Sequence, residues 1–159
     1  MRSRNAWVVG VFVLTLIGLS TCALAVSVYY AADEALLHQV LEGMEIEYLV
    51  ASDGDADPVW TFTSSGITIT IVSYDEVTPG SYASLLFYAG WSADSQISLF
   101  AINDWNRLSR FGRAYVDETG DPAIELDLLL TGGVTAQTIR EYIEIFVATV
   151  SDLGVSLQL

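Results

Sequence analysis

The feature that most restricts the fold is a change between strand-like and helix-like hydrophobic periodicity along the chain. Residues 67–72 alternate Ile and Thr before ending in Ile-Val, so apolar side chains recur at every second position, as in a half-buried strand. The final segment instead spaces its apolar residues three or four apart between Ile139 and Leu153, as on one face of a helix. A chain with both patterns folds into packed layers of helix and sheet.

The remaining elements follow from the same patterns and from the turn residues between them. Further helices are predicted at residues 32–42 and 98–109, and further strands at 60–62, 82–88, 111–117 and 123–130. Thr135 is the expected N-cap of the last helix and Gly154 its C-terminal glycine. The predicted order is α-β-β-β-α-β-β-α, an α+β fold with a mainly antiparallel sheet packed by helices.

The first 25 residues form a separate unit. Two arginines precede a charge-free, largely apolar run that ends in Ala23-Leu24-Ala25, a small-residue tripeptide typical of a signal-peptidase site. We therefore predict a signal peptide over residues 1–25, cleavage between Ala25 and Val26, and a single domain over 26–159. The domain would then lie in the periplasm or on the extracytoplasmic face of the membrane.

Two other interpretations of this segment remain open. The uncharged stretch continues to about residue 32, which is long enough for an uncleaved membrane anchor. Cys22 could instead carry a lipid, although Thr21 and the apolar residues after Cys22 fit a lipoprotein signal poorly. All three interpretations export the domain. Cleavage after Ala25 would remove the chain's one cysteine, so the mature fold would be indifferent to redox conditions.

Charge excludes several classes of partner. The chain has 20 acidic residues and six basic ones, all arginines, giving a formal net charge of −14. A surface of this sign repels phosphate backbones and anionic lipid headgroups. We therefore expect no nucleic-acid partner, and membrane contact only through the N-terminal segment if it is uncleaved.

Three blocks of the sequence together resemble the YbjN family. Trp105-Asn106, Arg110-Phe111 and Ala114-Tyr115 follow one another closely in the first block. An acidic strand containing Glu125 and Asp127 forms the second block, and Gly132-Gly133-Val134 precedes the last helix as the third. The resemblance implies a fold like that of type III secretion chaperones, often dimeric. It also implies a bacterial sensory transduction regulator, a description that names no chemistry.

The residues that could carry chemistry are few. His38 is the only histidine, and we expect it to be an ordinary boundary residue rather than a metal ligand or catalytic base. Asp53, Asp55 and Asp57 mimic the start of a calcium loop, but the glycine and glutamate that such a loop needs are missing, so a solvated turn is expected. Gly132-Gly133 is expected to be a simple turn. The sequence predicts no catalytic residue, metal or cofactor.

Arginines are the more informative candidates. Arg107, Arg110 and Arg113 hold most of the positive charge of the mature chain, next to Trp105. Such a cluster either pairs with carboxylates of the same domain or forms a partner-binding patch, since Trp and Arg are enriched at interface hot spots. We predict that Trp105, with Ile102 and Leu108, packs against the sheet.

The remaining motif residues are expected to be structural. Asn106 should be a hydrogen-bonding residue, and Phe111 and Tyr115 lie in the strand predicted after the second helix. A three- or five-residue loop should pair Arg113 with Asp127 across the last hairpin, because an even loop would place Arg113 among core residues.

These features favour a non-enzymatic binding, chaperone-like or regulatory module of the cell envelope, with a protein or peptide partner. The alternatives are a carboxylate-dependent enzyme acting on a small molecule, and a purely structural homodimer. Carboxylates with raised pKa converging in a pocket would favour the enzyme. An apolar groove beside the sheet would favour binding.

Overall fold

The computed structural model describes residues 26–51, 58–93 and 96–159, so the predicted signal peptide and the Asp53–Asp57 turn lie outside the described residues. The described residues form three helices and seven strands. In chain order these are β1 (Ala32–Asp33), α1 (Glu34–Gly43), β2 (Tyr48–Ala51), β3 (Val59–Ser64), β4 (Ile67–Thr78), β5 (Ser81–Gly90), α2 (Leu99–Leu108), β6 (Arg113–Val116), β7 (Pro122–Leu129) and α3 (Ala136–Leu157).

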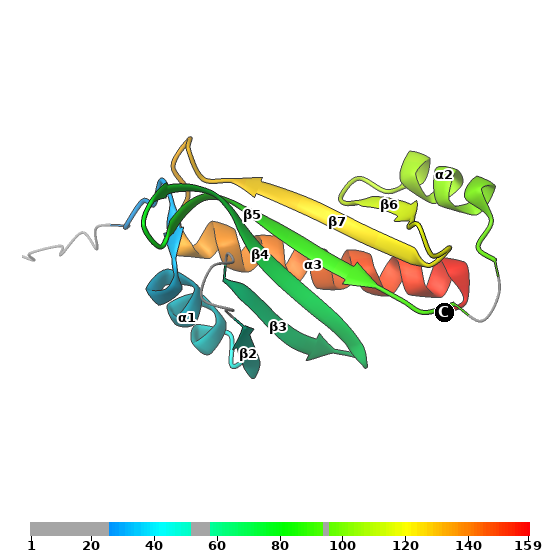
Figure 1. Cartoon of the computed structure of the whole chain (residues 1–159), viewed down its shortest axis with the longest axis horizontal. Helices are drawn as coiled ribbons and strands as arrows, with labels where there is room; N and C mark the ends of the chain where they lie inside the picture. The colour runs from blue at the N-terminus through cyan, green and yellow to red at the C-terminus, as the bar shows by residue number, and fades with distance from the viewer. Residues whose placement is uncertain (1–25, 52–57, 94–95) are drawn as a thin grey trace, which may run out of the picture.

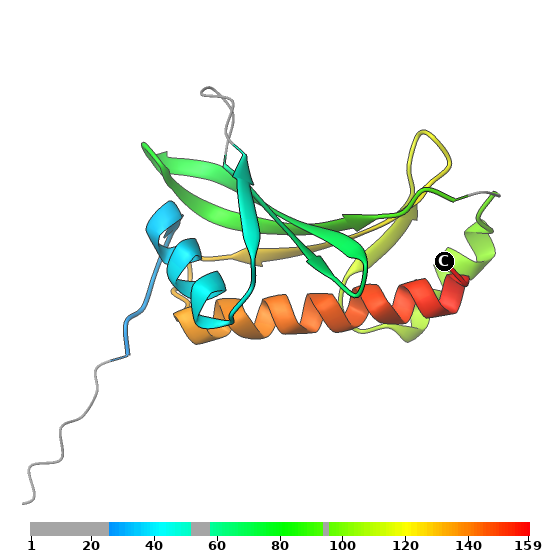
Figure 2. The ribbon, with the colours of Figure 1, turned by 90° about the horizontal axis from the view of Figure 1, so that it is seen from below.

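The strands form one antiparallel sheet in the order β2-β3-β4-β5-β7-β6, with the short β1 paired to β5. Helices α1 and α3 lie on one side of this curved sheet, and α2 lies at its far end beside β6 (Figures 1 and 2). The other side, which carries Thr70, Tyr88 and Glu125, is covered by none of the described helices, and we call it the open face. The predicted α+β class is therefore confirmed.

One core fills the space between the sheet and its helices. Trp60, Ile71 and Phe87 point into it from three neighbouring strands, and each is fully buried. The apolar stripe predicted for the last helix supplies the opposite wall, where Phe146 packs on Phe87 with ring centroids 5.9 Å apart. The two periodicities of the sequence thus meet in a single core.

The ends of the helices follow their capping residues, with one correction. Asp33 accepts a hydrogen bond from the Leu36 amide at the start of α1, and Thr135 accepts one from the Thr138 amide at the start of α3. The prediction that Gly154 ends the last helix was wrong. Gly154 is buried inside α3 beneath Trp91, and the helix ends in a left-handed residue at Gln158.

Sequence periodicity missed two strands, so the order gains β1 before the first helix and β2 after it. β1 is only two residues long, and β2 is four, which is too short for either period to show. β2 nevertheless forms one edge of the sheet among the described residues, and it helps to line a groove beside that edge.

Candidate partner-binding surfaces

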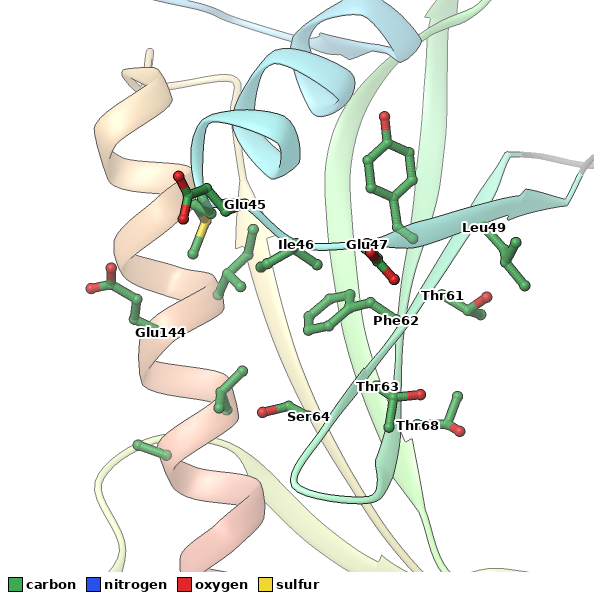
Figure 3. A pocket seen from close by; sticks show the side chains of 15 residues that line it. Glu45, Ile46, Glu47, Leu49, Thr61, Phe62, Thr63, Ser64, Thr68 and Glu144 are labelled. Carbon is green, nitrogen blue, oxygen red and sulfur yellow. The ribbon is translucent and has the colours of Figure 1, made fainter.

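A groove opens between α3 and the sheet edge formed by β2 and β3 (Figure 3). Its volume is about 940 Å³. Apolar side chains line its inner part and come from three separate stretches of chain: Met44, Ile46, Phe62, Ile143 and Val147. Threonine and serine side chains of β3 and β4 line its outer part.

The groove exists because β3 is longer than its neighbour. Pairing between β2 and β3 stops at Tyr48 opposite Phe62, so Thr63 and Ser64 extend beyond the end of β2. Residues 44–47 cross from α1 to β2 at this point and leave the edge of β3 facing α3. The strand edge therefore ends beside a half-buried apolar helix surface rather than beside another strand.

Three carboxylates surround the groove. Glu45 and Glu144 lie on the α3 side, and Glu47 lies on the side of the strands (Figure 3). All three side chains are exposed, and none forms an ion pair with another described residue. The entrance to an apolar groove is therefore uniformly negative.

We call the three carboxylates at the entrance, Glu45, Glu47 and Glu144, the rim of the groove. The arginine of α3 does not pair with this rim. Arg140 lies one turn before Glu144, but its guanidinium packs over Gly43, where a Cβ atom would lie 2.3 Å from a terminal nitrogen. Gly43 ends α1, and the exposed carbonyls of a helix C-terminus favour a cation. Arg140 therefore lies beside the C-terminus of α1, and it forms no ion pair with Glu45 or Glu144.

His38 and Tyr48 stand where α1 meets β2. The His38 Nδ1 atom hydrogen-bonds the Tyr48 hydroxyl, and its Nε2 atom lies 3.2 Å from the Glu34 carboxylate. Burial raises the pKa of the Tyr48 phenol, and the negative charges of Glu42 and Glu34 raise it further. His38 is thus a boundary residue, as predicted, and it joins α1 to the edge strand. Among the described residues no group of three or more His, Cys, Asp or Glu is arranged to hold a metal ion.

A second candidate surface covers α2 and the turn after it, and we call it the α2 patch. Its apolar members are unusually exposed for their size, with Phe100 at 85% and Leu108 at 73%. The prediction that Leu108 packs beside Trp105 was wrong, because the helix turns Leu108 to solvent in its last residue. Leu99 and Phe111 are also exposed.

The three arginines lie at this end of the molecule but engage different groups. Arg107 lies 3.4 Å from Asp104 on the same helix, and Arg110 stacks over the Phe111 ring at 5.1 Å. Arg113 lies on β6, on the open face of the sheet, with its guanidinium 5.9 Å from the Tyr115 ring centroid. The α2 patch therefore combines apolar side chains with Arg107 and Arg110, while Arg113 belongs to the neighbouring strand.

Two motif residues anchor α2 as predicted. Trp105 is buried against the core together with Ile102. The Asn106 side chain donates to the Ala114 carbonyl and accepts from the Ala114 amide, both at 2.9 Å. Since β6 is the second edge of the described sheet, Asn106 supplies the hydrogen bonds that another strand would otherwise make.

The predicted pair between Arg113 and Asp127 was wrong by two residues of register. Arg113 lies directly opposite Glu125, and the two side chains form an ion pair. The connecting loop has five residues, 117–121, as one of the two predicted lengths allowed. Asp117 organises this loop, because its carboxylate accepts hydrogen bonds from the amides of Thr119 and Asp121 at 2.9 Å.

Glu125 also binds the other motif residue on β6. The Tyr115 hydroxyl donates to the Glu125 carboxylate at 2.6 Å. Burial and this hydrogen bond raise the pKa of Tyr115 far above its usual range. Asp127 lies exposed two residues further along β7 and acts on Arg113 only at a distance. The contacts of Glu125 with Tyr115 and Arg113 thus hold β6 and β7 in register.

Of the two glycines before α3, Gly133 is required by the backbone conformation of the turn. Gly133 has a φ of 85°, and a Cβ atom there would lie 2.9 Å from the Val28 side chain. The adjacent Val134 pairs with Tyr29, so this turn holds the N-terminal segment of the domain against the sheet. Gly132 is exposed and has open space around it.

A smaller cavity of about 260 Å³ lies on the open face and includes Asp117 and Asp121. Both carboxylates already accept hydrogen bonds, Asp117 from two amides of the loop and Asp121 from the Ala93 amide at 2.9 Å. The hydrogen bond from Thr119, followed by that from the Asp121 amide, lowers the pKa of Asp117. A general acid needs the opposite shift.

Comparison with known proteins now identifies the family. The model of the YbjN family, described as "Putative bacterial sensory transduction regulator", matches residues 33–158. The chain belongs to the YbjN family. The match begins at the Asp33 cap of α1 and ends at the left-handed Gln158 after α3, so the YbjN domain comprises nearly the whole described fold.

A solved structure shares the fold of this YbjN domain. It is a chain from the structure of the ExoT–SpcS complex from Pseudomonas aeruginosa, with a TM-score of 0.52 and 15% sequence identity. The similarity covers 74% of the present chain and 93% of the other. The type III secretion chaperone-like fold predicted from the family resemblance is thereby confirmed. A comparison with curated proteins finds no significant match.

Sequence reasoning identified the arginines, Trp105 and Asn106 but missed the groove and the apolar part of the α2 patch. A signal for the groove was present in Met44-Glu45-Ile46-Glu47-Tyr48, where apolar and acidic residues alternate. In the structure the apolar members face inward and the glutamates are exposed. Three helices are described, and none of them is both long and apolar enough to cross a bilayer.

Proposed function

We propose that this YbjN domain is a non-enzymatic, chaperone-like or regulatory module that binds a protein or peptide segment in the groove between α3 and the β2–β3 edge. The observation that carries the proposal is that Thr63 and Ser64 at the end of β3 pair with β4 but extend beyond β2, beside an apolar helix face. An extended segment could pair with Thr63 and Ser64 while its side chains enter the apolar part of the groove. The similar solved structure is that of a complex, ExoT–SpcS, which is consistent with a protein partner.

The place of action that we propose is the cell envelope. The support is the sequence of residues 1–25, with its arginines, apolar run and Ala23-Leu24-Ala25 tripeptide. A domain released or anchored there would meet exported or envelope proteins.

Site-specific crosslinking tests the groove proposal in the native envelope. A photoreactive phenylalanine analogue is placed at Ala148, an exposed α3 residue that lines the groove, and at Ala35, an exposed residue of α1 outside it. We expect a discrete protein adduct from position 148 and none from position 35. Equal labelling from both positions, or adducts from neither, would contradict the proposal.

A second proposal concerns the α2 patch, which we assign to self-association. Phe100 and Leu108 leave most of their apolar surface exposed on one helix, and clustered exposed apolar side chains are typical of an interaction site. Asp104 and Arg107 lie on the same helix, so a two-fold axis through α2 would let each aspartate pair with the arginine of the other copy. Positive charge is concentrated here in an acidic chain, so repulsion between copies would be weakest at this surface.

Sedimentation measurements on the purified protein test this second proposal. The wild type should sediment as a dimer, and the double substitution Phe100→Ser with Leu108→Ser should give a folded monomer. The control is Leu49→Ser, at a residue that is 75% exposed on the opposite edge of the sheet. A wild-type protein that stays monomeric at high concentration would rule the proposal out.

A further inference from the structure

The charges around the groove define its ligand more closely. We infer that the groove selects extended segments that carry arginine or lysine beside apolar residues, an inference that rests on the proposed function of the same site. The selectivity comes from Glu45, Glu47 and Glu144. These carboxylates surround an apolar cavity, and no described cation pairs with them.

The apolar part of the groove sets one half of the recognition. Ile46, Phe62 and Val147 come from three different segments and line a cavity of about 940 Å³, with Ile46 and Val147 half-buried and Phe62 buried. A charged segment without apolar side chains would leave this surface in contact with water. A segment that alternates the two kinds of residue can bury apolar side chains while its cations reach the rim.

The negatively charged rim determines the other half of the recognition. In Figure 3 the glutamates lie on both sides of the groove, two beside α3 and one beside the strands. A bound acidic segment would bring its carboxylates close to at least one of them, whichever direction it ran. Like charges placed together disfavour such a partner, which is a common basis of specificity.

The positions of the arginines leave the rim without a cation from the protein itself. Arg140 is turned toward Gly43, and the other arginines of the described chain lie in or beside the α2 patch at the far end of the sheet. No described residue therefore supplies a cation that pairs with these carboxylates, which leaves that role to the ligand. The overall charge of −14 would also draw cationic segments toward the molecule and repel acidic ones.

Fluorescence anisotropy with synthetic peptides tests the inference on the full purified chain. The probes are a short peptide that alternates valine with arginine, and a matched peptide with glutamate in place of arginine. The first should bind and the second should not. Binding should weaken when ionic strength rises from about 0.1 M to about 1 M, because the Debye length falls from about 10 Å to about 3 Å.

Two sets of variants separate the charge effect from the apolar one. Neutralising the rim with Glu45→Gln, Glu47→Gln and Glu144→Gln should raise the Kd of the arginine peptide about tenfold, equivalent to about 1.4 kcal/mol. A control removes three exposed carboxylates elsewhere, with Glu118→Gln, Glu141→Gln and Asp152→Asn, and should change Kd less than about twofold. The blocking variant Ala148→Trp should abolish binding, while Ala35→Trp should not.

The outcomes distinguish the inference from the function on which it rests. If both peptides bind equally, and Ala148→Trp blocks both, the groove binds segments but does not select cations, so the inference is overturned alone. If the two triple variants weaken binding equally, the effect is one of net charge, and the rim has no special role. If Ala148→Trp leaves the arginine peptide bound, the groove is not the binding site and the proposed function fails as well.

Discussion

Replacing Asn106 by alanine should detach α2 from the edge of the sheet. The side chain makes two hydrogen bonds of 2.9 Å with the backbone of Ala114, whose residue surface is 3% exposed. Each bond contributes about 0.5–1.5 kcal/mol net to stability. Loss of the Asn106 side-chain amide also leaves the backbone N–H and C=O groups of Ala114 without these partners in a poorly solvated place. We expect the free energy of unfolding to fall by about 2–3 kcal/mol.

Urea denaturation of Asn106→Ala against Asn103→Ala measures this effect. Asn103 is exposed on the same helix, and its side chain makes no hydrogen bond to another described residue, so its substitution should change stability by less than about 0.5 kcal/mol. Hydrogen exchange at the Ala114 amide should accelerate in the Asn106 variant before global unfolding. Equal stability of the two variants would show that the Asn106 bonds do not anchor α2.

Three further predictions concern other parts of the chain. Trp105→Ala should cost about 3–5 kcal/mol by denaturation, because the indole is buried against the core; a loss below about 1 kcal/mol would contradict its place there. The lowered pKa of Asp117 means that its contribution to the hairpin is present above the pKa of the unfolded state and is lost as pH falls through the folded pKa. An acid titration followed by hydrogen exchange should therefore show opening of the loop at low pH in the wild type, and Asp117→Asn should remove that pH dependence. N-terminal sequencing of the protein from the envelope should begin at Val26; a start at Met1 would establish an uncleaved anchor, and a lipid on Cys22 a lipoprotein.

The sequence predicted best those elements whose pattern is local and long. The 22 residues of α3 repeat their apolar spacing over several turns, and β4 alternates over its whole first half, so neither depends on knowing the rest of the fold. β2 is only four residues long and is held in place by pairing with β3, which is a tertiary contact. Its discovery therefore required the structure.

The register error at the last hairpin has a similar origin. Alternation fixes which side chains share a face, and Arg113 does lie on the open face with Glu125 and Asp127. It does not fix which pair stands opposite, because any odd loop preserves the faces. The Asp117 carboxylate decided that point by binding two amides within the loop.

The alternation over residues 44–48 marks one wall of the groove, but the groove as a whole could not be predicted from any single stretch of the chain. Its wall residues are separated by about a hundred positions, from Met44 to Ala148, and it depends on where a short strand stops relative to its neighbour. The sequence indicated only the charged part of the α2 patch, because its arginines are clustered in an otherwise acidic chain. Periodicity placed Trp105 on the core side correctly but gave no means of telling that the helix would end at Leu108.

Mapping peptide-induced chemical-shift changes onto the YbjN domain tests the central claim most directly. On titration with the valine–arginine peptide, the largest changes should fall on the amides of Thr63, Ser64 and Val147, with little change at Asn103 on α2. Such a map would place the ligand between the free edge of β3 and α3. Changes centred on the α2 patch or on the open face of the sheet would contradict the assignment of the groove as the partner-binding site.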